Sequence, residues 1–453
     1  MKKLSILTLC IIITACQREI PNYAIFSGKI ENTDSKTVLV TGENFRKEIL
    51  IKEDGTFSDT LKIEAKGYYN YKIGNESSLI YLDRGYALHL NIDTNEFDET
   101  IKYSGKNANE NTFLALKFLV VEKMTGNTKE FYILSPDAFK KKAAEIKSAL
   151  IDSLAKSNAN EVFTEIEKTN IHYDYLANLL QYPRTHSYFA KIEKVDLPVR
   201  FLNETEGLDF DNSEDYKNSD GYQQIVTNNF YTTLGAKAKK DSVPFEDIAL
   251  EYIKTLKSKN IKNGLLKTLS YRVSPNNEKA EDLYKAIIAI STDTAFNNKL
   301  TISFNKIKTL AKGQPSPTFN YENYKGGNTT LADLAGKYVY IDVWATWCGP
   351  CIAEIPALKI VEKNYHGKNI QFVSISIDQM KDHEKWKKMV IEKELGGIQL
   401  FADNDWKSQF VTDYGIEGIP RFILIDPDGK IVTANAHRPS NDRLITLFNE
   451  LGI

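Results

Sequence analysis

The residues that decide the fold of the last third of this chain are Val343-Trp344-Ala345-Thr346-Trp347-Cys348-Gly349-Pro350-Cys351. They join an apolar run at 337–344, typical of a buried strand, to a helical pattern at 350–365. Pro350 suits the first turn of a helix, where its missing N–H would have no partner. A helix N-terminus carries unpaired N–H groups and about half a positive charge, and both favour a thiolate. We therefore expect Cys348 to be the nucleophile, with a lowered pKa, and Cys351 to resolve a mixed disulfide.

A Cys-x-x-Cys pair has two other common explanations. Zinc takes about four ligands, and the chain has neither a second Cys-x-x-Cys pair nor histidines at ligand spacing. A purely structural disulfide here would close a small loop and would restrict the unfolded chain little. We therefore expect a redox-active dithiol that uses no metal and no cofactor.

Strand and helix signals alternate around this dithiol. The alternation predicts an α/β domain at 313–453, whose central, partly parallel sheet has helices on both faces. A Gly-Gln-Pro-Ser-Pro segment at 313–317 marks a linker before it, because X-Pro steps favour extended chain and end helices. The further elements expected are strands at 370–377 and 421–425, helices at 383–394 and 443–451, and a hairpin strand after the turn at 426–429.

The first two thirds of the chain predict two more domains, so the fold class is multi-domain α+β. A β-rich domain at 16–104, a sandwich or a barrel, is indicated by strand patterns at 24–30, 48–51, 56–61 and 86–92. A helical domain at 105–312 is indicated by three- and four-residue apolar spacing, for example at 136–156 and 245–270, and we expect five to seven helices. The aromatic-rich stretch at 171–175 either lines a pocket or packs in the core of an amphipathic helix, and core packing is favoured.

The N-terminus is typical of an export signal. Lys2 and Lys3 precede an apolar run at 4–15 that is too short to span about 30 Å of hydrocarbon as a helix. Ile13-Thr14-Ala15-Cys16 resembles a bacterial lipobox, in which cleavage precedes a cysteine that carries a lipid. The resemblance implies a signal peptide at 1–15, which would remove Cys10, and a lipid on Cys16. We expect a lipid-anchored envelope protein that faces the periplasm, on either membrane.

The composition excludes other classes of protein. Hydrophobic residues make up 42% and charged residues 26% of the 453 residues, which is the balance of globular domains rather than of a multi-pass membrane protein. The 58 Lys and Arg residues against 60 Asp and Glu give a net charge of −2, which leaves no positive excess for binding nucleic acid.

The region 315–453 resembles the TlpA/ResA-like thiol–disulfide oxidoreductases, which have a thioredoxin fold. The matching features are the Trp-Cys-Gly-Pro-Cys motif at 347–351, Asp342 six residues before the first cysteine, Pro356 five residues after the second, and Gly418-Ile419-Pro420. The order of signal, β-rich region and helical region also resembles a class of Gram-negative envelope proteins, but this adds no site residues.

The resemblance implies roles for the matched residues. Pro420 corresponds to a cis-proline across from the cysteines, which leaves the backbone of Ile419 free to pair with an incoming peptide. Trp347 is expected to form a flat contact surface over the sulfurs, and Gly349 and Pro350 complete the substrate-binding set. Pro356 is expected to kink the helix that carries the cysteines.

Two acids are candidates for moving the proton of Cys351. Asp342 lies on the strand that leads to the site, among apolar neighbours, and matches the buried acid of thioredoxin. Glu354 lies one turn beyond Cys351 on the same helical face and matches the acid of the ResA-like branch. Burial raises the pKa of a carboxyl group towards the working pH, and we expect Asp342 to matter more.

These features predict a membrane-tethered thiol–disulfide oxidoreductase. A Cys-Gly-Pro-Cys site of thioredoxin type favours reduction, since thioredoxin's potential is about −270 mV against about −120 mV for DsbA. The expected partners are disulfide-containing envelope proteins, a membrane electron donor and the lipid bilayer, and the family resemblance adds cytochrome c maturation. The alternatives are a peroxiredoxin-type peroxidase, and an envelope lipoprotein that binds a ligand or protein and carries an auxiliary redox domain.

Overall fold

The structure is a computed structural model that describes residues 21–43, 45–275, 277 and 279–453. The predicted signal peptide, Cys10 and the predicted lipid site Cys16 lie outside the described residues. The chain divides into two compact units, Met1–Asp241 and Ser242–Ile453. The helices at 105–312 are therefore shared between the two units, and the three-domain boundaries inferred from sequence stay a prediction.

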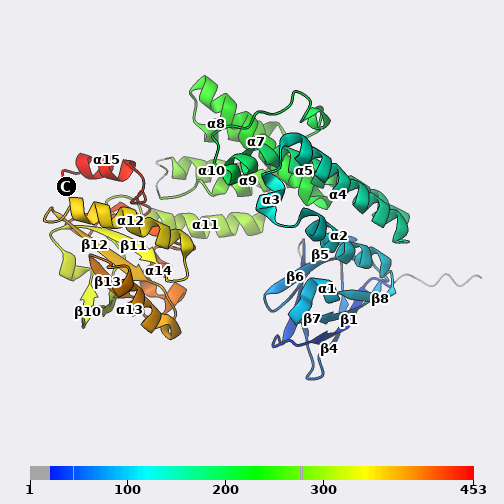
Figure 1. Cartoon of the computed structure of the whole chain (residues 1–453), viewed down its shortest axis with the longest axis horizontal. Helices are drawn as coiled ribbons and strands as arrows, with labels where there is room; N and C mark the ends of the chain where they lie inside the picture. The colour runs from blue at the N-terminus through cyan, green and yellow to red at the C-terminus, as the bar shows by residue number, and fades with distance from the viewer. Residues whose placement is uncertain (1–20, 44, 276, 278) are drawn as a thin grey trace, which may run out of the picture. The chain divides into compact units, whose positions relative to one another are not determined.

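The first unit begins with a β-sandwich (Figure 1). One sheet has the order β4-β1-β7-β8 and the other β3-β2-β5-β6, and only the β1–β7 pair is parallel among the pairs in these sheets. Alternating residues of β1 are buried between the sheets, among them Phe26, which lies against Phe57 and Tyr71. The strands are β1 Ala24–Glu31, β2 Thr37–Gly42, β3 Phe45–Leu50, β4 Thr56–Leu61, β5 Gly67–Ile73, β6 Glu76–Leu82, β7 Ala87–Asp93 and β8 Lys102–Lys106.

Helices complete the first unit. Side-chain caps begin several of them: Asn127, Asn160 and Asn212 each accept backbone N–H groups of the first turn that follows. The longest, α5, contacts both α4 and α7. The helices are α1 Phe97–Thr100, α2 Asn109–Thr125, α3 Thr128–Tyr132, α4 Pro136–Lys156, α5 Glu161–Ala190, α6 Ser213–Asn218 and α7 Asp220–Asp241.

The second unit starts with four helices, α8 Phe245–Thr255, α9 Lys259–Ser270, α10 Ala280–Ile290 and α11 Thr294–Thr309. The segment expected to be helical at 245–270 is two helices, because Leu256 and Ser258 are extended. The expectation of five to seven helices at 105–312 is wrong, since the described residues there form ten, α2 to α11. Short helices such as α3 and α6 hold too few turns for apolar periodicity to separate them from loops.

A seven-stranded sheet with the order β10-β9-β13-β12-β11-β14-β15 forms the centre of the second unit. The pairs β11–β12 and β12–β13 are parallel and the other pairs are antiparallel, which confirms the partly parallel sheet. The elements are β9 Asn320–Asn323, β10 Asn328–Thr330, β11 Tyr338–Trp344, α12 Gly349–Asn364, β12 Ile370–Ser376, α13 His383–Glu392, β13 Ile398–Phe401, α14 Gln409–Asp413, β14 Arg421–Ile425, β15 Ile431–Thr433 and α15 Arg443–Glu450.

Helices cover both faces of this sheet, as expected. On one face lie α12 and α15 (Figure 1). Leu358 and Val361 of α12 and Phe448 of α15 pack there in one core. On the other face Trp386 of α13 and Phe410 of α14 pack in a second core. Each face of the sheet is therefore buried, which explains why β11 is buried along nearly its whole length and is mostly apolar.

The expected linker at 313–317 begins with a turn at Gly313 and pairs with the edge of the sheet. The N–H of Gly313 donates to the carbonyl of Ile431, and the N–H of Ser316 donates to the carbonyl of Gly429. These bonds join the chain before β9 to the hairpin that ends in β15.

Candidate functional site

The dithiol lies at the N-terminus of α12, where the sequence predicts it. Cys348 is the N-cap residue, and Cys348 and Cys351 form a disulfide. The N–H of Cys351 donates to Sγ of Cys348 at 3.2 Å. Both cysteines are buried, so exposure does not distinguish them, but the N-cap position and this hydrogen bond favour negative charge on Cys348.

Three exposed residues surround the buried Cys348: Trp347, Gly349 and Pro350. The Trp347 side chain is 52% exposed, and its ring lies 6.3 Å from that of Trp406. A large apolar side chain exposed beside a reactive group is a suitable contact surface for an incoming protein. The assignment of these residues to substrate binding stays a prediction.

The Ile419–Pro420 peptide bond is cis, as the family resemblance implies. Strand β14 begins at the next residue, Arg421, which pairs with Val343 near the end of β11. Because β11 leads directly into the dithiol loop, this pairing places Ile419 and Pro420 at the same edge of the sheet as the cysteines. Ile419 itself packs against the apolar core that contains both cysteines.

A buried acid that the sequence reasoning missed, Asp378, holds the loop before Cys348. Its carboxylate accepts the N–H of Thr346 at 2.9 Å and the Thr346 hydroxyl at 2.8 Å. The hydroxyl of Ser376 also donates to it, at 2.7 Å. Asp378 follows β12, which is parallel to β11. Because the carboxyl ends of neighbouring parallel strands meet at one edge of a sheet, an acid after β12 could have been predicted to lie near the loop after β11.

Asp342 is buried on β11, and among the described residues its Oδ1 atom has no hydrogen-bonding partner. Burial, followed by the negative charges of Glu362 and Glu354, raises the pKa of Asp342 to about 8. A carboxyl group with such a pKa can accept and return a proton near neutral pH. The structure therefore agrees with the expectation that Asp342 is a desolvated acid rather than a member of an ion pair.

Glu354, the other expected acid, is buried but engaged elsewhere. Its carboxylate accepts the N–H of Ser440 at 3.1 Å and the Ser440 hydroxyl at 2.9 Å, and Arg438 lies 3.6 Å away. These contacts tie the middle of α12 to the segment before α15. Pro356, also in α12, does not end the helix, which continues to Asn364.

Glu362 on α12 is a further acid that the sequence reasoning missed. Burial raises its pKa to about 7, although nearby Lys359 acts in the opposite direction. The sequence could have predicted the helical face on which Glu362 lies. Cys351, Leu358 and Glu362 are spaced by seven and four residues and therefore share one face of the helix. Nothing in that spacing shows that the carboxyl group is desolvated.

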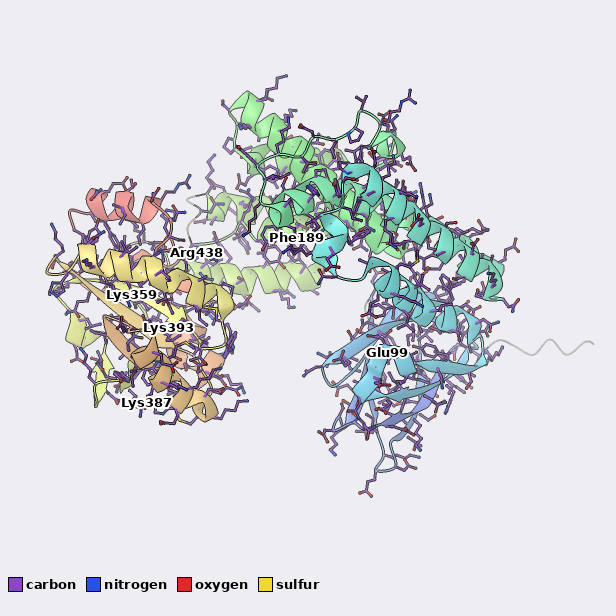
Figure 2. The ribbon with its side chains drawn as sticks, in the orientation of Figure 1. Glu99, Phe189, Lys359, Lys387, Lys393 and Arg438 are labelled. Carbon is purple, nitrogen blue, oxygen red and sulfur yellow. A yellow bond between two sulfur atoms is a disulfide. The ribbon has the colours of Figure 1, made fainter. Side chains whose placement is uncertain are left out.

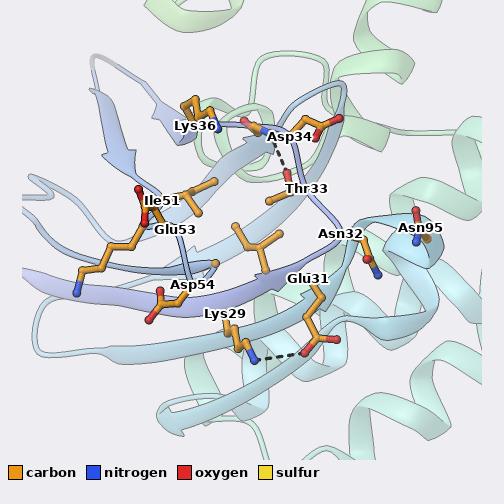
Figure 3. A pocket seen from close by; sticks show the side chains of 14 residues that line it. Lys29, Glu31, Asn32, Thr33, Asp34, Lys36, Ile51, Glu53, Asp54 and Asn95 are labelled. Atoms are coloured by element: carbon orange, nitrogen blue, oxygen red, sulfur yellow. Dashed lines mark hydrogen bonds and ion pairs between the residues drawn. The ribbon is translucent and has the colours of Figure 1, made fainter.

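Two other pockets lie in the first unit. A polar pocket at one end of the sandwich is lined by 29–36, 51–55 and Asn95, and Figure 3 shows Lys29 paired with Glu31 there. A second cavity, of about 330 Å³, is lined by Ile171, Asp174 and Tyr175 among other residues of the helices. Ile171 and Tyr175 are also buried in the core, so the aromatic stretch at 171–175 both packs and lines a pocket.

The described residues offer neither a cluster of metal ligands nor a membrane-spanning helix. No group of three or more His, Cys, Asp and Glu side chains in this part of the chain is arranged to hold a metal ion. No helix in it is both long and apolar enough to cross a membrane.

Comparison with known proteins places the dithiol domain in a family. Residues 312–434 match the model of the AhpC/TSA family. The thioredoxin domain of a thiol–disulfide oxidoreductase from Bacteroides vulgatus, known from a crystal structure, is 31% identical, and the match covers 98% of that domain and 31% of this chain, with a TM-score of 0.29. This chain belongs to the thiol–disulfide oxidoreductases of the thioredoxin fold. A second structure from the same organism, assigned to the same class, is 52% identical over 92% of its length and 32% of this chain, with a TM-score of 0.28.

Curated relatives match part of the length of this thiol–disulfide oxidoreductase. The thiol-disulfide oxidoreductase ResA of Bacillus subtilis is 28% identical over 127 residues, which are 28% of this chain and 67% of the relative. The thioredoxin-like protein YneN of the same organism is 28% identical over 122 residues, 27% of this chain and 69% of the relative. The chain spans about two thirds of the length of these relatives.

Proposed function

We propose that this protein reduces disulfide bonds of other proteins with the Cys348–Cys351 dithiol. The observation that carries the proposal is the cysteine pair at the N-terminus of α12, with Cys348 as N-cap and acceptor of the Cys351 N–H. The Cys348 thiolate attacks a substrate disulfide, forms a mixed disulfide and releases one substrate thiolate. Cys351 then loses its proton and attacks Sγ of Cys348. This second attack releases the other substrate thiolate and forms the Cys348–Cys351 disulfide.

The residues around the dithiol supply what this exchange needs. Exposed Trp347 gives an incoming chain an apolar contact, and the backbone of Ile419, before cis-Pro420, offers it hydrogen bonds. Asp342 takes the proton of Cys351 during the second attack, because its raised pKa suits transfer near neutral pH. A membrane electron donor restores the dithiol after each cycle, and cytochrome c maturation is one process that would use such a reductase.

A peroxidase of peroxiredoxin type is the alternative enzyme, and the geometry of Thr346 speaks against it. A peroxidatic site needs a threonine hydroxyl near the reacting sulfur. Here the Thr346 hydroxyl donates to the buried carboxylate of Asp378. The loop before Cys348 is therefore built to hold the start of α12 rather than to bind a peroxide.

An assay that compares the two reactions tests the proposed function. We expect the purified protein to reduce insulin disulfides when a small dithiol reagent is added to return the protein to its reduced form. We expect it to consume hydrogen peroxide no faster than the Cys348→Ser variant does. We expect insulin reduction rather than peroxide consumption because Cys351 can attack a mixed disulfide between Cys348 and a substrate protein and so release the substrate. Rapid peroxide consumption that requires Cys348, without insulin reduction, would replace the proposal by the peroxidase.

We also propose that a lipid on Cys16 holds the protein on a membrane of the cell envelope, with the dithiol in the periplasm. We expect Cys16→Ala to move the protein from the membrane fraction to the soluble fraction without lowering insulin reduction. Loss of the acyl chains removes about 0.8 kcal/mol of membrane affinity for each buried CH₂ group. Fractionation with Cys10→Ala as the matched control checks this, and retention of Cys16→Ala in the membrane would contradict the anchor.

A further inference from the structure

A small cavity lies between α12 and the strands β11, β12 and β13. Its volume is about 10 Å³, close to the least that one water molecule needs. Acidic side chains reach it from two sides: Asp342 from β11 and Glu362 from α12. The cavity is lined by Asp342, Trp344, Ile355, Leu358, Lys359, Glu362, Ser374, Leu395, Gly396 and Gln399.

Three residues of this cavity carry a buried polar atom that has no protein partner among the described residues. They are Oδ1 of Asp342, Nε1 of Trp344 and Oε1 of Gln399. The other end of the Gln399 amide is fixed, because its Nε2 donates to the carbonyl of Gly396 at 2.7 Å. Trp344 offers a donor and Gln399 an acceptor, so one water molecule could bond to both and to Asp342. Buried polar groups in native proteins almost always have such partners.

Glu362 reaches the cavity from its solvent side. The side chain is half-buried, and its carboxylate lies against Gly396: a Cβ atom placed on Gly396 would be only 2.3 Å from Oε2 of Glu362. Two neighbouring carboxyl groups in a desolvated site repel one another when both are ionised. This repulsion disfavours the state in which Asp342 and Glu362 are both ionised near neutral pH.

The other charged groups around the pair do not neutralise Asp342. Lys359, labelled in Figure 2, lines the cavity. Its Nζ bonds to the carbonyl of Lys393 at 3.1 Å and to Glu394 at 3.3 Å. Glu354 is bonded to Ser440, and the Tyr340 hydroxyl donates to the carbonyl of His437. Within the described residues no ion pair of Asp342 exists, so its proton must leave by way of a neighbouring acid or water.

We propose that Glu362 is a positioning residue that relays protons between Asp342 and solvent through a water molecule in this cavity. The inference rests on the proposed exchange reaction. When Cys351 attacks the mixed disulfide, its proton goes to Asp342, and the relay then carries a proton to the Glu362 carboxylate and on to solvent. The steps run in reverse when a donor restores the dithiol. Asp342 and Glu362 therefore return to their starting protonation states after each cycle.

Two variants of different chemistry test the relay. Glu362→Gln removes the charge and keeps the shape of the side chain. Gly396→Ala adds a methyl group where the Glu362 carboxylate lies and displaces the flexible end of that side chain, without changing any titratable group. Gly396 is not among the residues with positive φ, so alanine fits its backbone. Glu392→Gln on α13, where the side chain is exposed, is the matched control for the charge.

The first measurement is the titration of Asp342 in the oxidised protein, followed by the ¹³C resonance of its carboxyl carbon. We expect the midpoint to fall by about one pH unit in Glu362→Gln, because the nearest like charge is gone. Gly396→Ala should lower the midpoint of Asp342 by a smaller amount, and Glu392→Gln should leave the midpoint unchanged. This readout does not depend on activity, so it stands even if the protein reduces no disulfides.

The second measurement is the pH profile of insulin reduction. We expect Glu362→Gln to turn over about three- to ten-fold more slowly at pH 7, with a profile shifted to lower pH, since relayed proton transfer supports general acid–base catalysis. An unchanged Asp342 midpoint in both variants would overturn the proposal. Slower turnover with an unshifted profile would also overturn it, because that result describes a merely structural role.

Discussion

Replacement of Cys348 by serine is expected to lower insulin reduction by about 10³-fold or more, to the rate of the uncatalysed reaction. Serine at the N-cap of α12 retains the hydrogen bond to the Cys351 N–H, so the helix should stay intact while the nucleophile is lost. Turbidity or fluorescence assays of insulin reduction measure the rate, and circular dichroism checks the fold. The effect is the largest expected because the other cysteine of the pair, Cys351, carries out the second attack and does not start the exchange.

The matched variant is Cys351→Ser, which should behave in the opposite way. Cys348 can still attack a substrate disulfide, but the mixed disulfide has no resolving thiol and should accumulate. Non-reducing electrophoresis and mass spectrometry of the trapped adducts would name the substrates. If Cys351→Ser trapped no protein while Cys348→Ser did, the assignment of nucleophile and resolving thiol would be reversed.

Replacement of Asp342 by asparagine is expected to slow turnover at neutral pH by on the order of 10- to 100-fold, as loss of a general acid–base group does. Glu354→Gln should have a smaller effect, since that carboxylate is held by Ser440 and Arg438 and is not free to move a proton. The double variant should lose less than the product of the two effects if both acids serve one step. Rates measured between pH 6 and 8 check this, and equal rates in all variants would exclude carboxylate-assisted exchange.

The same substitution, Asp342→Asn, should stabilise the fold at alkaline pH. The pKa of Asp342 is raised from 3.8 to about 8 in the folded protein, so folding favours the protonated form. The stability that this proton contributes is complete below about pH 4 and is lost as the pH rises to about 8, at about 1.4 kcal/mol for each pH unit. The asparagine side chain cannot ionise, so the variant does not lose this stability as the pH rises. The free energy of unfolding of the variant should therefore exceed that of the wild type by several kcal/mol at pH 8.

Unfolding by urea at pH 4 and pH 8 measures the predicted difference. At pH 4 both proteins carry a neutral side chain at this position, and their free energies of unfolding should be similar. At pH 8, close to the pKa of Asp342, the wild type either keeps a proton that the unfolded chain has lost or holds an ionised, unpaired carboxylate in its core, and both states reduce its stability. The same difference in free energy at both pH values would show that Asp342 keeps an ordinary pKa in the folded protein.

The local parts of the site were readable from the sequence. The strand that ends at Trp344, the helix that starts beside Cys348 and the acid on that strand all follow from patterns within a few residues of one another. Local rules of this kind work because a buried strand needs an apolar run and a helix N-terminus needs residues that tolerate free N–H groups. The cis-proline at 420 was accessible only through the family resemblance of its motif, and the structure agrees.

The tertiary structure decided which distant side chains complete the site. Asp378 supports Thr346 from 32 residues away, and Ser440 binds Glu354 from 86 residues away. The cavity at Asp342 depends on the order of three strands and on the packing of α12 against them, and Glu362 is desolvated only there. Periodicity shows which face of a helix is apolar, but it does not show what lies opposite that face. Whether a charged group is buried depends on the element that packs against it, so the sequence of one element alone does not predict it.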